Sequence, residues 1–455
     1  MLNVVVLAAG KGTRMRSNKP KVLHHLAGDT LLNHVLNSAR NLGADNLCVV
    51  IGHEAEQVRQ SVGEHNTVIF VEQKPQLGTG HAVQLTASHL VDDVPTLVLY
   101  GDVPLTQVET LQRLIAHANG RTLALLTVNL ADPTGYGRIV RDGQGRVSKI
   151  VEQKDAGADE LTIKEVNTGI LVAPTASLKR WLSQLSNQNA QGEYYLTDVI
   201  AMAVADGLSI ATEQPASEWE TLGVNSKIQL AQLERIYQTQ AAQSLMEQGV
   251  GLVDPARIDI RGQLTCGMDV EIDVNCVFEG QVQLGDGVQI GANCVIRNAR
   301  IAKNTQVAPF THIDGAHVGE SAKIGPFARL RPDAVLADHT HIGNFVEIKK
   351  TVLGTGSKVN HLAYVGDATV GKNVNIGAGV ITCNYDGVNK HQTFIGDGAF
   401  IGSDSQLIAP VTIGAGATIG AGSTITKEAP PDQLTLARGK QVTIEGWKRP
   451  EKKAK

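Results

Sequence analysis

Residues 395–425 read IGDGAFIGSDSQLIAPVTIGAGATIGAGSTI, and an aliphatic residue occupies every sixth position of this stretch. An α-helix repeats after about 3.6 residues and a strand after about two, so neither element generates this period. A coil of three short strands does generate it, with the aliphatic side chain pointing inward and a small residue at the corner. The six positions are Ile395, Ile401, Leu407, Ile413, Ile419 and Ile425. The stretch therefore predicts a parallel β-helix of hexapeptide repeats.

The same period extends toward the N-terminus, with a few steps shortened to five. Its positions are Val318, Ile324, Leu330, Leu336, Ile342, Ile348, Leu353, Val359, Val365, Val370 and Ile376. The repeat is interrupted by an inserted segment, residues 383–394. A loop that leaves a regular solenoid is more often functional than accidental. The alternative is that the solenoid is a purely structural spacer.

Upstream of the repeat, residues 226–248 contain no glycine or proline and open with Ser226 and Gln229 in capping-box spacing. This pattern predicts a helix that connects two domains. We therefore expect three segments: a first domain at 1–227, a helical linker at 228–248 and a β-helix domain at 249–455.

The first domain alternates apolar strands with helices. Strands are predicted at 3–9, 47–51, 67–71, 96–100 and 123–128, and a helix at 30–42. Continuous apolar strands separated by helices indicate a Rossmann-like α/β fold whose mainly parallel sheet is covered on both faces. Ligands of such sheets bind at the carboxyl ends of the strands, where Ala8-Ala9-Gly10 and Tyr100-Gly101-Asp102 are expected.

Composition excludes several classes of protein. With Lys+Arg 41 against Asp+Glu 45, the net charge of −4 does not suggest a nucleic-acid-binding surface. The five cysteines form no C-x-x-C pair, so neither a disulfide framework nor a thiolate zinc site is indicated. No apolar run approaches the ~18 residues that span a bilayer, and the N-terminus is unlike a signal peptide. We expect a cytoplasmic protein without a membrane partner, ending in a solvated basic tail at 447–455.

The loop Gly10-Lys11-Gly12-Thr13-Arg14 follows the first strand, and its glycines would let backbone amides approach a phosphate. It matches neither a Rossmann fingerprint nor a Walker A loop, and by itself a plain turn explains it equally well. Asp102 could hold a divalent metal on nucleotide phosphates or could cap the helix expected near Pro104. Asn225 could be a second metal ligand or could begin the linker helix.

The whole chain resembles the GlmU family of bacterial bifunctional enzymes. The motifs that carry the resemblance in the first half are LAAGKGTRM, PKVLH, QLGTGHA, LYGDVPL, DPTGYGRI, VNTGIL, NAQGEYYLTD and GVN; those in the second half are FARLRP, GNFVEIKK, NIGAGVITCNYDG and IGSDSQLIAPV. Members join an N-acetylglucosamine-1-phosphate uridylyltransferase to a glucosamine-1-phosphate N-acetyltransferase on a left-handed β-helix. The resemblance implies a homotrimer, with acetyltransferase sites between neighbouring β-helices. The trimer is consistent with four phenylalanines of the solenoid, whose surface a partner could cover: Phe327, Phe345, Phe394 and Phe400.

For the first site, the resemblance implies that Asp102 and Asn225 bind Mg²⁺, that Lys21 contacts phosphate and that Arg14 stabilises the triphosphate or leaving pyrophosphate. It places the uridine and its phosphates against Leu7, Ala8, Ala9, Gly10, Gln73, Gly78, Thr79, Tyr100 and Gly101. Gln73 would offer a bidentate amide to the uracil edge. Gly137, Glu152 and Asn167 would bind the sugar and its N-acetyl group, although without the resemblance they read as a turn glycine and surface polar residues.

For the second site, the resemblance implies that His361 is the general base. It implies that Arg331 and Lys349 bind the phosphate of the sugar, and that Tyr364, Asn375, Asn384 and Tyr385 position the acceptor and the acetyl donor. Acetyl-CoA would run past Ala378, Ser403 and Ala421 to Arg438. A zinc-binding β-helix enzyme of the carbonic anhydrase kind, using His339, His341 and His361, would leave Arg331, Lys349 and the inserted loop unexplained.

The sequence thus predicts an enzyme that acetylates glucosamine-1-phosphate and couples the product to UMP from UTP, giving UDP-N-acetylglucosamine for cell-envelope precursors. Two other readings remain open. One is a sugar-nucleotide pyrophosphorylase with a single activity and a regulatory β-helix. The other is a non-catalytic regulatory subunit, against which Arg14, Lys21 and Asp102 argue.

Overall fold

The computed structural model describes residues 1–63, 68–118 and 120–452. The chain divides into two compact units, Met1–Tyr237 and Gln238–Lys455. The first residue of the predicted strand 67–71 lies outside the described ranges. The last residues of the basic tail, 453–455, also lie outside them. None of the helices in the described part of the chain has the length and apolar character needed to cross a membrane.

The first unit is built on a nine-stranded sheet with the order β11-β7-β10-β6-β1-β4-β5, to which β8 and β9 attach beside β10. Its strands are β1 (Asn3–Leu7), β4 (Asn46–Ile51), β5 (Val68–Glu72), β6 (Pro95–Tyr100), β7 (Thr122–Asn129), β8 (Arg138–Arg141), β9 (Val147–Val151), β10 (Glu165–Pro174) and β11 (Ser209–Glu213). A small hairpin joins β2 (His25–Leu26) to β3 (Asp29–Thr30). β1 pairs in parallel with β4 and β6, while β10 runs antiparallel between β6 and β7.

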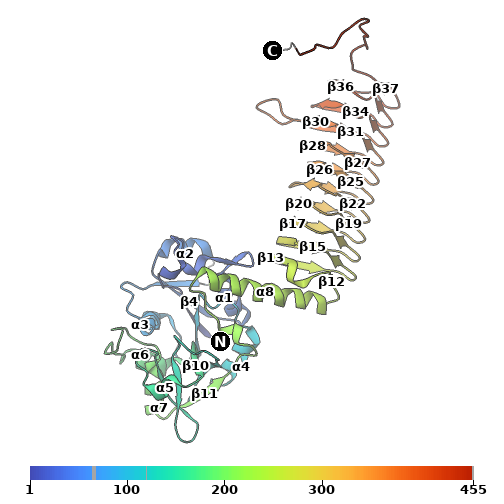
Figure 1. Ribbon diagram of the computed structural model, residues 1–455. Coiled ribbons are helices and arrows are strands. Elements are labelled where there is room, and N and C mark those ends of the chain that lie inside the picture. Colours follow the sequence, from blue (N-terminus) through green and yellow to red (C-terminus); the bar gives the residue numbers. More distant parts are fainter. Residues whose placement is uncertain (64–67, 119, 453–455) are drawn as a thin grey trace. The chain divides into compact units, whose positions relative to one another are not determined.

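Helices cover both faces of this sheet (Figure 1). They are α1 (Leu31–Asn41), α2 (Ala55–Val62), α3 (Thr79–Gln84), α4 (Val108–Ala116), α5 (Ala158–Leu161), α6 (Thr175–Leu182) and α7 (Asp198–Ala205). Alternate residues of β1 enter opposite cores: Val4 and Val6 pack in one cluster with residues of α1, α2 and α4, and Val5 packs in another with residues of α3, α6 and α7. This confirms the predicted covered, mainly parallel sheet. The antiparallel β8–β10 segment was not predicted.

The helix α8 (Lys227–Glu247) begins within one residue of its predicted start. The Ser226 hydroxyl accepts from the Gln229 amide at 3.2 Å and so caps one of the first amides of the helix. The Gln229 side chain in turn accepts from the backbone amide of Asn225, just before the helix, at 2.8 Å. Leu233 packs with Met15 and Leu105 in the first unit, and Ala242 and Leu245 belong to the core of the second.

The second unit is a parallel β-helix whose strands stack as successive rungs (Figure 1). One sheet contains β12 (Gly251–Leu252), β14 (Glu271–Ile272), β16 (Gln289–Ile290), β19 (Gln306–Val307), β22 (Lys323–Ile324), β25 (His341–Asn344), β27 (Lys358–His361), β29 (Asn375–Ile376), β32 (Phe400–Ile401), β35 (Thr418–Ile419) and β37 (Leu434–Thr435). The other contains β13 (Ile258–Cys266), β15 (Cys276–Leu284), β17 (Val295–Arg297), β18 (Arg300–Ile301), β20 (His312–Asp314), β21 (His317–Val318), β23 (Arg329–Leu330), β24 (Val335–Leu336), β26 (Glu347–Leu353), β28 (Tyr364–Val370), β30 (Ile381–Cys383), β31 (Thr393–Ile395), β33 (Gln406–Ile408), β34 (Val411–Ile413) and β36 (Thr424–Ile425).

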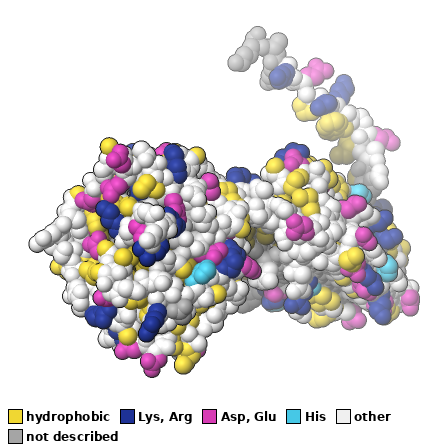
Figure 2. All heavy atoms as spheres, turned by 90° about the horizontal axis from the view of Figure 1, so that it is seen from below, with side chains coloured by type: hydrophobic (Ala, Val, Ile, Leu, Met, Phe, Trp, Pro, Cys, Tyr) yellow, Lys and Arg dark blue, Asp and Glu magenta, His cyan; other side chains and the backbone are white. Residues whose placement is uncertain are grey.

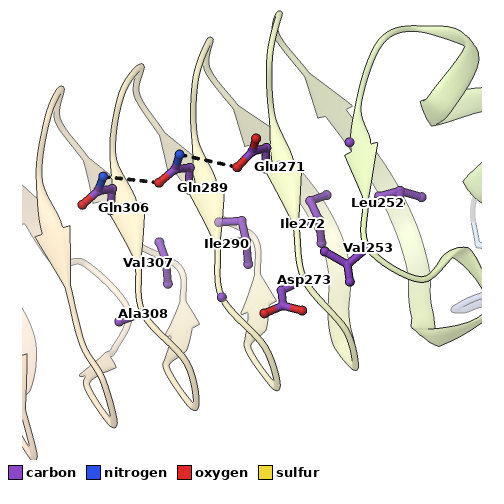
Figure 3. A pocket seen from close by; sticks show the side chains of 12 residues that line it. Leu252, Val253, Glu271, Ile272, Asp273, Gln289, Ile290, Gln306, Val307 and Ala308 are labelled. Atoms are coloured by element: carbon purple, nitrogen blue, oxygen red, sulfur yellow. Dashed lines mark hydrogen bonds between the residues drawn. The ribbon is translucent and has the colours of Figure 1, made fainter.

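The hexapeptide pattern is confirmed by burial. Every aliphatic position of the predicted repeat from Val318 to Ile425 is at most 4% exposed. Equivalent residues of successive coils lie in rows, and one such row, Glu271, Gln289 and Gln306, lines a pocket (Figure 3). The side-chain amide of Gln289 donates to Glu271 at 3.5 Å, and that of Gln306 donates to Gln289 at 3.3 Å. The fold thus places residues about 17 or 18 positions apart side by side, which is the rule that assembles the second site.

All five cysteines are free thiols, as the sequence predicts. Basic and acidic side chains are interspersed over the face drawn in Figure 2.

Candidate active sites

The carboxyl ends of β1 and β6 open into a pocket of about 390 Å³. The Gly101 amide donates to the Leu7 carbonyl at 2.9 Å and so holds the two strand ends together. The predicted residues that line the pocket are Leu7, Ala8, Ala9, Gly10, Lys21, Gln73, Gly78, Thr79, Tyr100 and Asp102. Residues from four separate sequence motifs, together with Gln73, thus meet in one place.

Lys21 connects the two predicted metal ligands. Its ammonium donates to Asp102 Oδ2 and, at 3.0 Å, to Asn225 Oδ1. The Val224 amide donates to the Asp102 carbonyl at 2.9 Å, which brings Asn225 to the end of β6 from over 100 residues away. Because the Lys21 and Asp102 side chains are only 13% and 16% exposed, water screens their attraction weakly.

The oxygens of Asp102 and Asn225 fit a divalent cation. They already converge on one positive charge, and carboxylate and amide oxygens are ligands that Mg²⁺ accepts together with substrate phosphates. Among residues 1–63, 68–118 and 120–452, no three His, Cys, Asp or Glu side chains form a ready-made metal cage. This pair of oxygens therefore suits a metal that arrives with phosphates rather than a metal held by protein alone.

Two segments far apart in sequence, around Gly78 and around Tyr194, meet beside the pocket. The Gly80 amide donates to the Tyr194 carbonyl and the Tyr194 amide to the Leu77 carbonyl, both at 2.8 Å. Gly78 has φ of 109°, and a Cβ there would come within 2.6 Å of the Tyr194 carbonyl. The Thr79 hydroxyl accepts from the Leu196 amide at 3.2 Å.

Gln73 is 4% exposed, and its Nε2 donates to the Gly78 carbonyl at 2.9 Å and lies 3.2 Å from His81 Nδ1. Both amide hydrogens of Gln73 are thus directed to its own loop, and Oε1 is the group left for a ligand. Gln76, which the sequence reasoning missed, donates to the Ala9 carbonyl and lines the same pocket with Glu193. Both residues lie inside motifs that carried the family resemblance, which is the signal that could have found them.

Gly137, Glu152 and Asn167 form a neighbouring group. The Asn167 amide donates to the Gly137 carbonyl at 2.8 Å, and a Cβ on Gly137 would lie 3.5 Å from the Glu152 carboxylate. Glu152 accepts from the Thr197 hydroxyl at 3.0 Å. Burial raises the pKa of Glu152, and the nearby Asp155 and Asp198 add to the effect.

Tyr100 and Arg14 differ in their exposure and in their relation to the pocket. Burial raises the pKa of Tyr100, with Glu152 and Asp102 adding to it, so the phenol stays neutral. Arg14 is exposed on the short turn Thr13–Met15 that follows the glycine loop, and it does not line the pocket.

The second site lies on adjacent coils of the β-helix. Arg331 donates to Glu347 at 2.8 Å, and Lys349 lies 3.7 Å from Asp367. His361 ends β27, whose Lys358 pairs with Asn375 of β29. The register of parallel rungs thus brings Arg331, Lys349, His361 and Asn375 onto consecutive coils.

The inserted segment folds back onto these coils. Asn384 is 8% exposed and donates to Asp367 at 2.5 Å and to the Tyr364 hydroxyl at 3.2 Å. Tyr385 bridges to Lys390 across the base of the loop. The neighbouring Lys349 ammonium lowers the pKa of Lys390, and Arg331 adds to the effect.

Sequence reasoning missed Lys390 and Asp367. Lys390, Lys349 and Arg331 gather positive charge around Asp367, a carboxylate that is only 5% exposed. Arg331 is already paired with Glu347, whereas Lys349 and Lys390 share the carboxylate of Asp367, so the cluster is suited to an additional anion. The inserted loop had been singled out as functional, and its single lysine was the available signal.

Ala378, Ser403 and Ala421 occupy equivalent places on successive coils. The strands before them pair in register through Ile376, Ile401 and Ile419. Arg438 donates to the Ala421 carbonyl at 2.9 Å and so lies at the end of this row. The three histidines considered for zinc are absent from any metal-holding group among the described residues.

Comparison with known proteins identifies the family of the chain. The MobA-like NTP transferase domain matches residues 4–249, the GMPPB C-terminal domain matches 260–344, and the bacterial transferase hexapeptide repeat matches 392–427. The chain is 62% identical to the bifunctional protein GlmU of Ralstonia nicotianae over 454 residues, covering 100% of both chains. It is 61% identical to that of Aromatoleum aromaticum, covering 99% of both, and 60% identical to that of Nitrosospira multiformis, covering 100% and 99%. The matches cover the nucleotidyltransferase domain, the hexapeptide repeats and the full length of the relatives. They show that the chain belongs to the family of bifunctional GlmU enzymes.

Proposed function

We propose that the first unit transfers UMP from UTP to N-acetylglucosamine-1-phosphate, and that the β-helix acetylates glucosamine-1-phosphate with acetyl-CoA. The observation that carries the proposal is that Lys21 and Asp102 line one pocket with Leu7–Gly10 and that Lys21 also contacts Asn225. Its counterpart in the β-helix is a cationic cluster beside the coil that bears His361. We assign the two activities to residues 1–227 and 249–455, with 228–248 as linker.

In uridylyl transfer, a phosphate oxygen of the sugar phosphate forms a bond to the α-phosphorus of UTP while the bond to pyrophosphate breaks. No protein nucleophile is needed, so catalysis consists of positioning and charge neutralisation. Mg²⁺, held by Asp102 and Asn225, would neutralise phosphate charge when bound. Lys21 contacts phosphate at the same place, and Arg14 on its exposed turn stabilises the triphosphate or the departing pyrophosphate.

The rest of the first site recognises the uracil base and the N-acetylglucosamine. Gln73 Oε1 accepts from the uracil N3–H, because its Nε2 is used by the Gly78 loop. Thr79, Tyr100 and Gly101 complete the nucleotide side. Glu152 accepts from hydroxyls of N-acetylglucosamine beside Gly137 and Asn167, which already lie together.

In acetyl transfer, the amine of glucosamine-1-phosphate forms the C–N bond to the acetyl carbonyl, the C–S bond breaks and CoA leaves as its thiol. His361 takes the proton that the amine loses. Arg331, Lys349 and Lys390 bind the phosphate, Tyr364 and Asn375 position the sugar, and Asn384 and Tyr385 hold the acetyl donor. The pantetheine chain would lie along Ala378, Ser403 and Ala421, with Arg438 at its phosphates.

We also propose a homotrimer. Phe310, Phe327 and Phe345 are stacked on consecutive coils with ring centroids 5.0 and 5.3 Å apart, and they are 53%, 46% and 55% exposed. Phe394 and Phe400 are 45% and 49% exposed. Exposed aromatic rows of this kind are covered in assemblies more often than left in water. Light scattering at several concentrations would test the trimer, and a persistent monomer would refute it.

The acetyl transfer assignment is tested by release of free CoA thiol from acetyl-CoA and glucosamine-1-phosphate, with the parent beside His361→Ala. Release by the parent and its loss in the variant support the assignment. No release from a folded parent would instead favour a pyrophosphorylase whose β-helix is regulatory.

A further inference from the structure

Asn344 and His361 are direct partners across two coils of the β-helix. The parallel register between β25 and β27 pairs His341 with Lys358, Ile342 with Val359 and Asn344 with His361. Side chains that are paired in this way emerge on the same side of the sheet. The backbone also fixes this corner, because the Leu362 amide donates to the Asn344 carbonyl at 3.1 Å.

The side chains of the pair are joined by a hydrogen bond. His361 Nδ1 lies 2.8 Å from Asn344 Oδ1. An amide oxygen can only accept, so Nδ1 must carry the hydrogen. In a neutral imidazole the other ring nitrogen, Nε2, is then unprotonated, and this is the form that can remove a proton.

The other groups near the ring do not replace this contact. On β25, burial lowers the pKa of His341, and Lys323, Lys358 and His361 add to the effect, so His341 tends to be neutral. On β27 itself the nearby charged group is Lys358, and β29 contributes Asn375, which does not titrate. The ring nitrogen Nδ1 is thus bonded to the amide of Asn344 and not to a carboxylate, so a neutral group sets the tautomer.

We propose that Asn344 is a positioning residue for acetyl transfer, which holds His361 in the tautomer that leaves Nε2 free to accept the proton of the amine. The proposal rests on the proposed function, in which His361 is the general base. A neutral amide fixes the ring without the added attraction that a carboxylate would exert on the protonated imidazole. The protonated imidazole of His361 can therefore release its proton again after the transfer.

The test compares acetyl transfer by the full-length parent with Asn344→Ala, Asn344→Asp and His361→Ala, each over a range of pH. Asn344→Ala is expected to lower kcat by about 10- to 100-fold with KM for both substrates nearly unchanged, because the ring loses its fixed tautomer. Asn344→Asp keeps an accepting oxygen and is expected to retain most of the activity. Its acid limb should move to higher pH by about one unit or more, because a carboxylate stabilises the protonated ring.

Asn293→Asp provides a matched control, since Asn293 lies on a coil several turns away and its Oδ1 accepts from Asn275 at 3.1 Å. It should leave kcat and the pH profile unchanged, and all variants should keep the parental circular dichroism spectrum and the parental melting of the β-helix, which shows that this unit is folded. Parental kcat in Asn344→Ala, or an unshifted acid limb in Asn344→Asp, would overturn the positioning role. Full activity of His361→Ala would instead overturn the proposed function.

Discussion

The backbone of Gly12 lies directly against the side chain of Lys21: a Cβ placed on Gly12 would come within 2.6 Å of the Lys21 Cβ, and Gly12 has φ of 62°. The glycine at position 12 therefore has a structural role of its own. It leaves room for the lysine stem that carries the ammonium to Asp102 and Asn225.

Gly12→Ala should displace Lys21 and place an alanine in the left-handed region, where side chains are disfavoured. We expect uridylyl transfer to fall by about 10-fold or more in kcat/KM, since a charge-assisted contact is worth about 1.5–3 kcal/mol. Pyrophosphate release measures it. Gly143→Ala, a site with open space around the added Cβ, is the control. Unchanged kcat/KM in Gly12→Ala would show that the close contact is irrelevant to the site.

Glu152→Gln should stabilise the first unit at neutral pH while weakening uridylyl transfer. Burial raises the pKa of Glu152, so the folded chain holds this proton more tightly than the unfolded chain does. The stability that the group contributes is therefore present below its unfolded pKa and is lost as pH rises through the raised folded value. Gln keeps an acceptor for Thr197 and carries no charge beside Asp155 and Asp198.

The measurement is the Tm of parent and Glu152→Gln from pH 4 to pH 8. The variant should melt at a higher temperature than the parent at pH 8, and the difference should shrink toward pH 4. A lower Tm than the parent at pH 8 would mean that the ionised carboxylate stabilises the fold.

Lys390→Ala should raise the KM for glucosamine-1-phosphate by about 10-fold or more and leave the KM for acetyl-CoA nearly unchanged. The reason is that Lys390 and Lys349 repel each other until an anion lies between them. Steady-state CoA release at low salt gives both constants, and added salt should reduce the difference. Lys427→Ala, an exposed lysine outside the loop, should behave as the parent; an unchanged KM in Lys390→Ala would remove Lys390 from the phosphate site.

The period of six could be read from the sequence because each coil repeats the same local rule, and positions such as Ile342 and Ile401 are buried as predicted. The antiparallel strand β10 could not be predicted from the sequence. It pairs with β6 and β7, which are distant in sequence, and such pairing produces no periodic pattern within the strand itself. The meeting of Lys21 with Asn225, 204 residues away, was expected only through the family resemblance. The approach of Lys390 to Lys349 depends on how the inserted loop folds back, which neither period nor composition reveals.

The central claim is that one chain holds two independent active sites. The most direct test measures pyrophosphate release from UTP with N-acetylglucosamine-1-phosphate, and CoA release with glucosamine-1-phosphate, on the same preparations of parent, Asp102→Ala and His361→Ala. Asp102→Ala should lose metal-dependent uridylyl transfer and keep acetyl transfer, whereas His361→Ala should show the reverse. If either variant, still folded, lost both activities together, the two-site account would be contradicted.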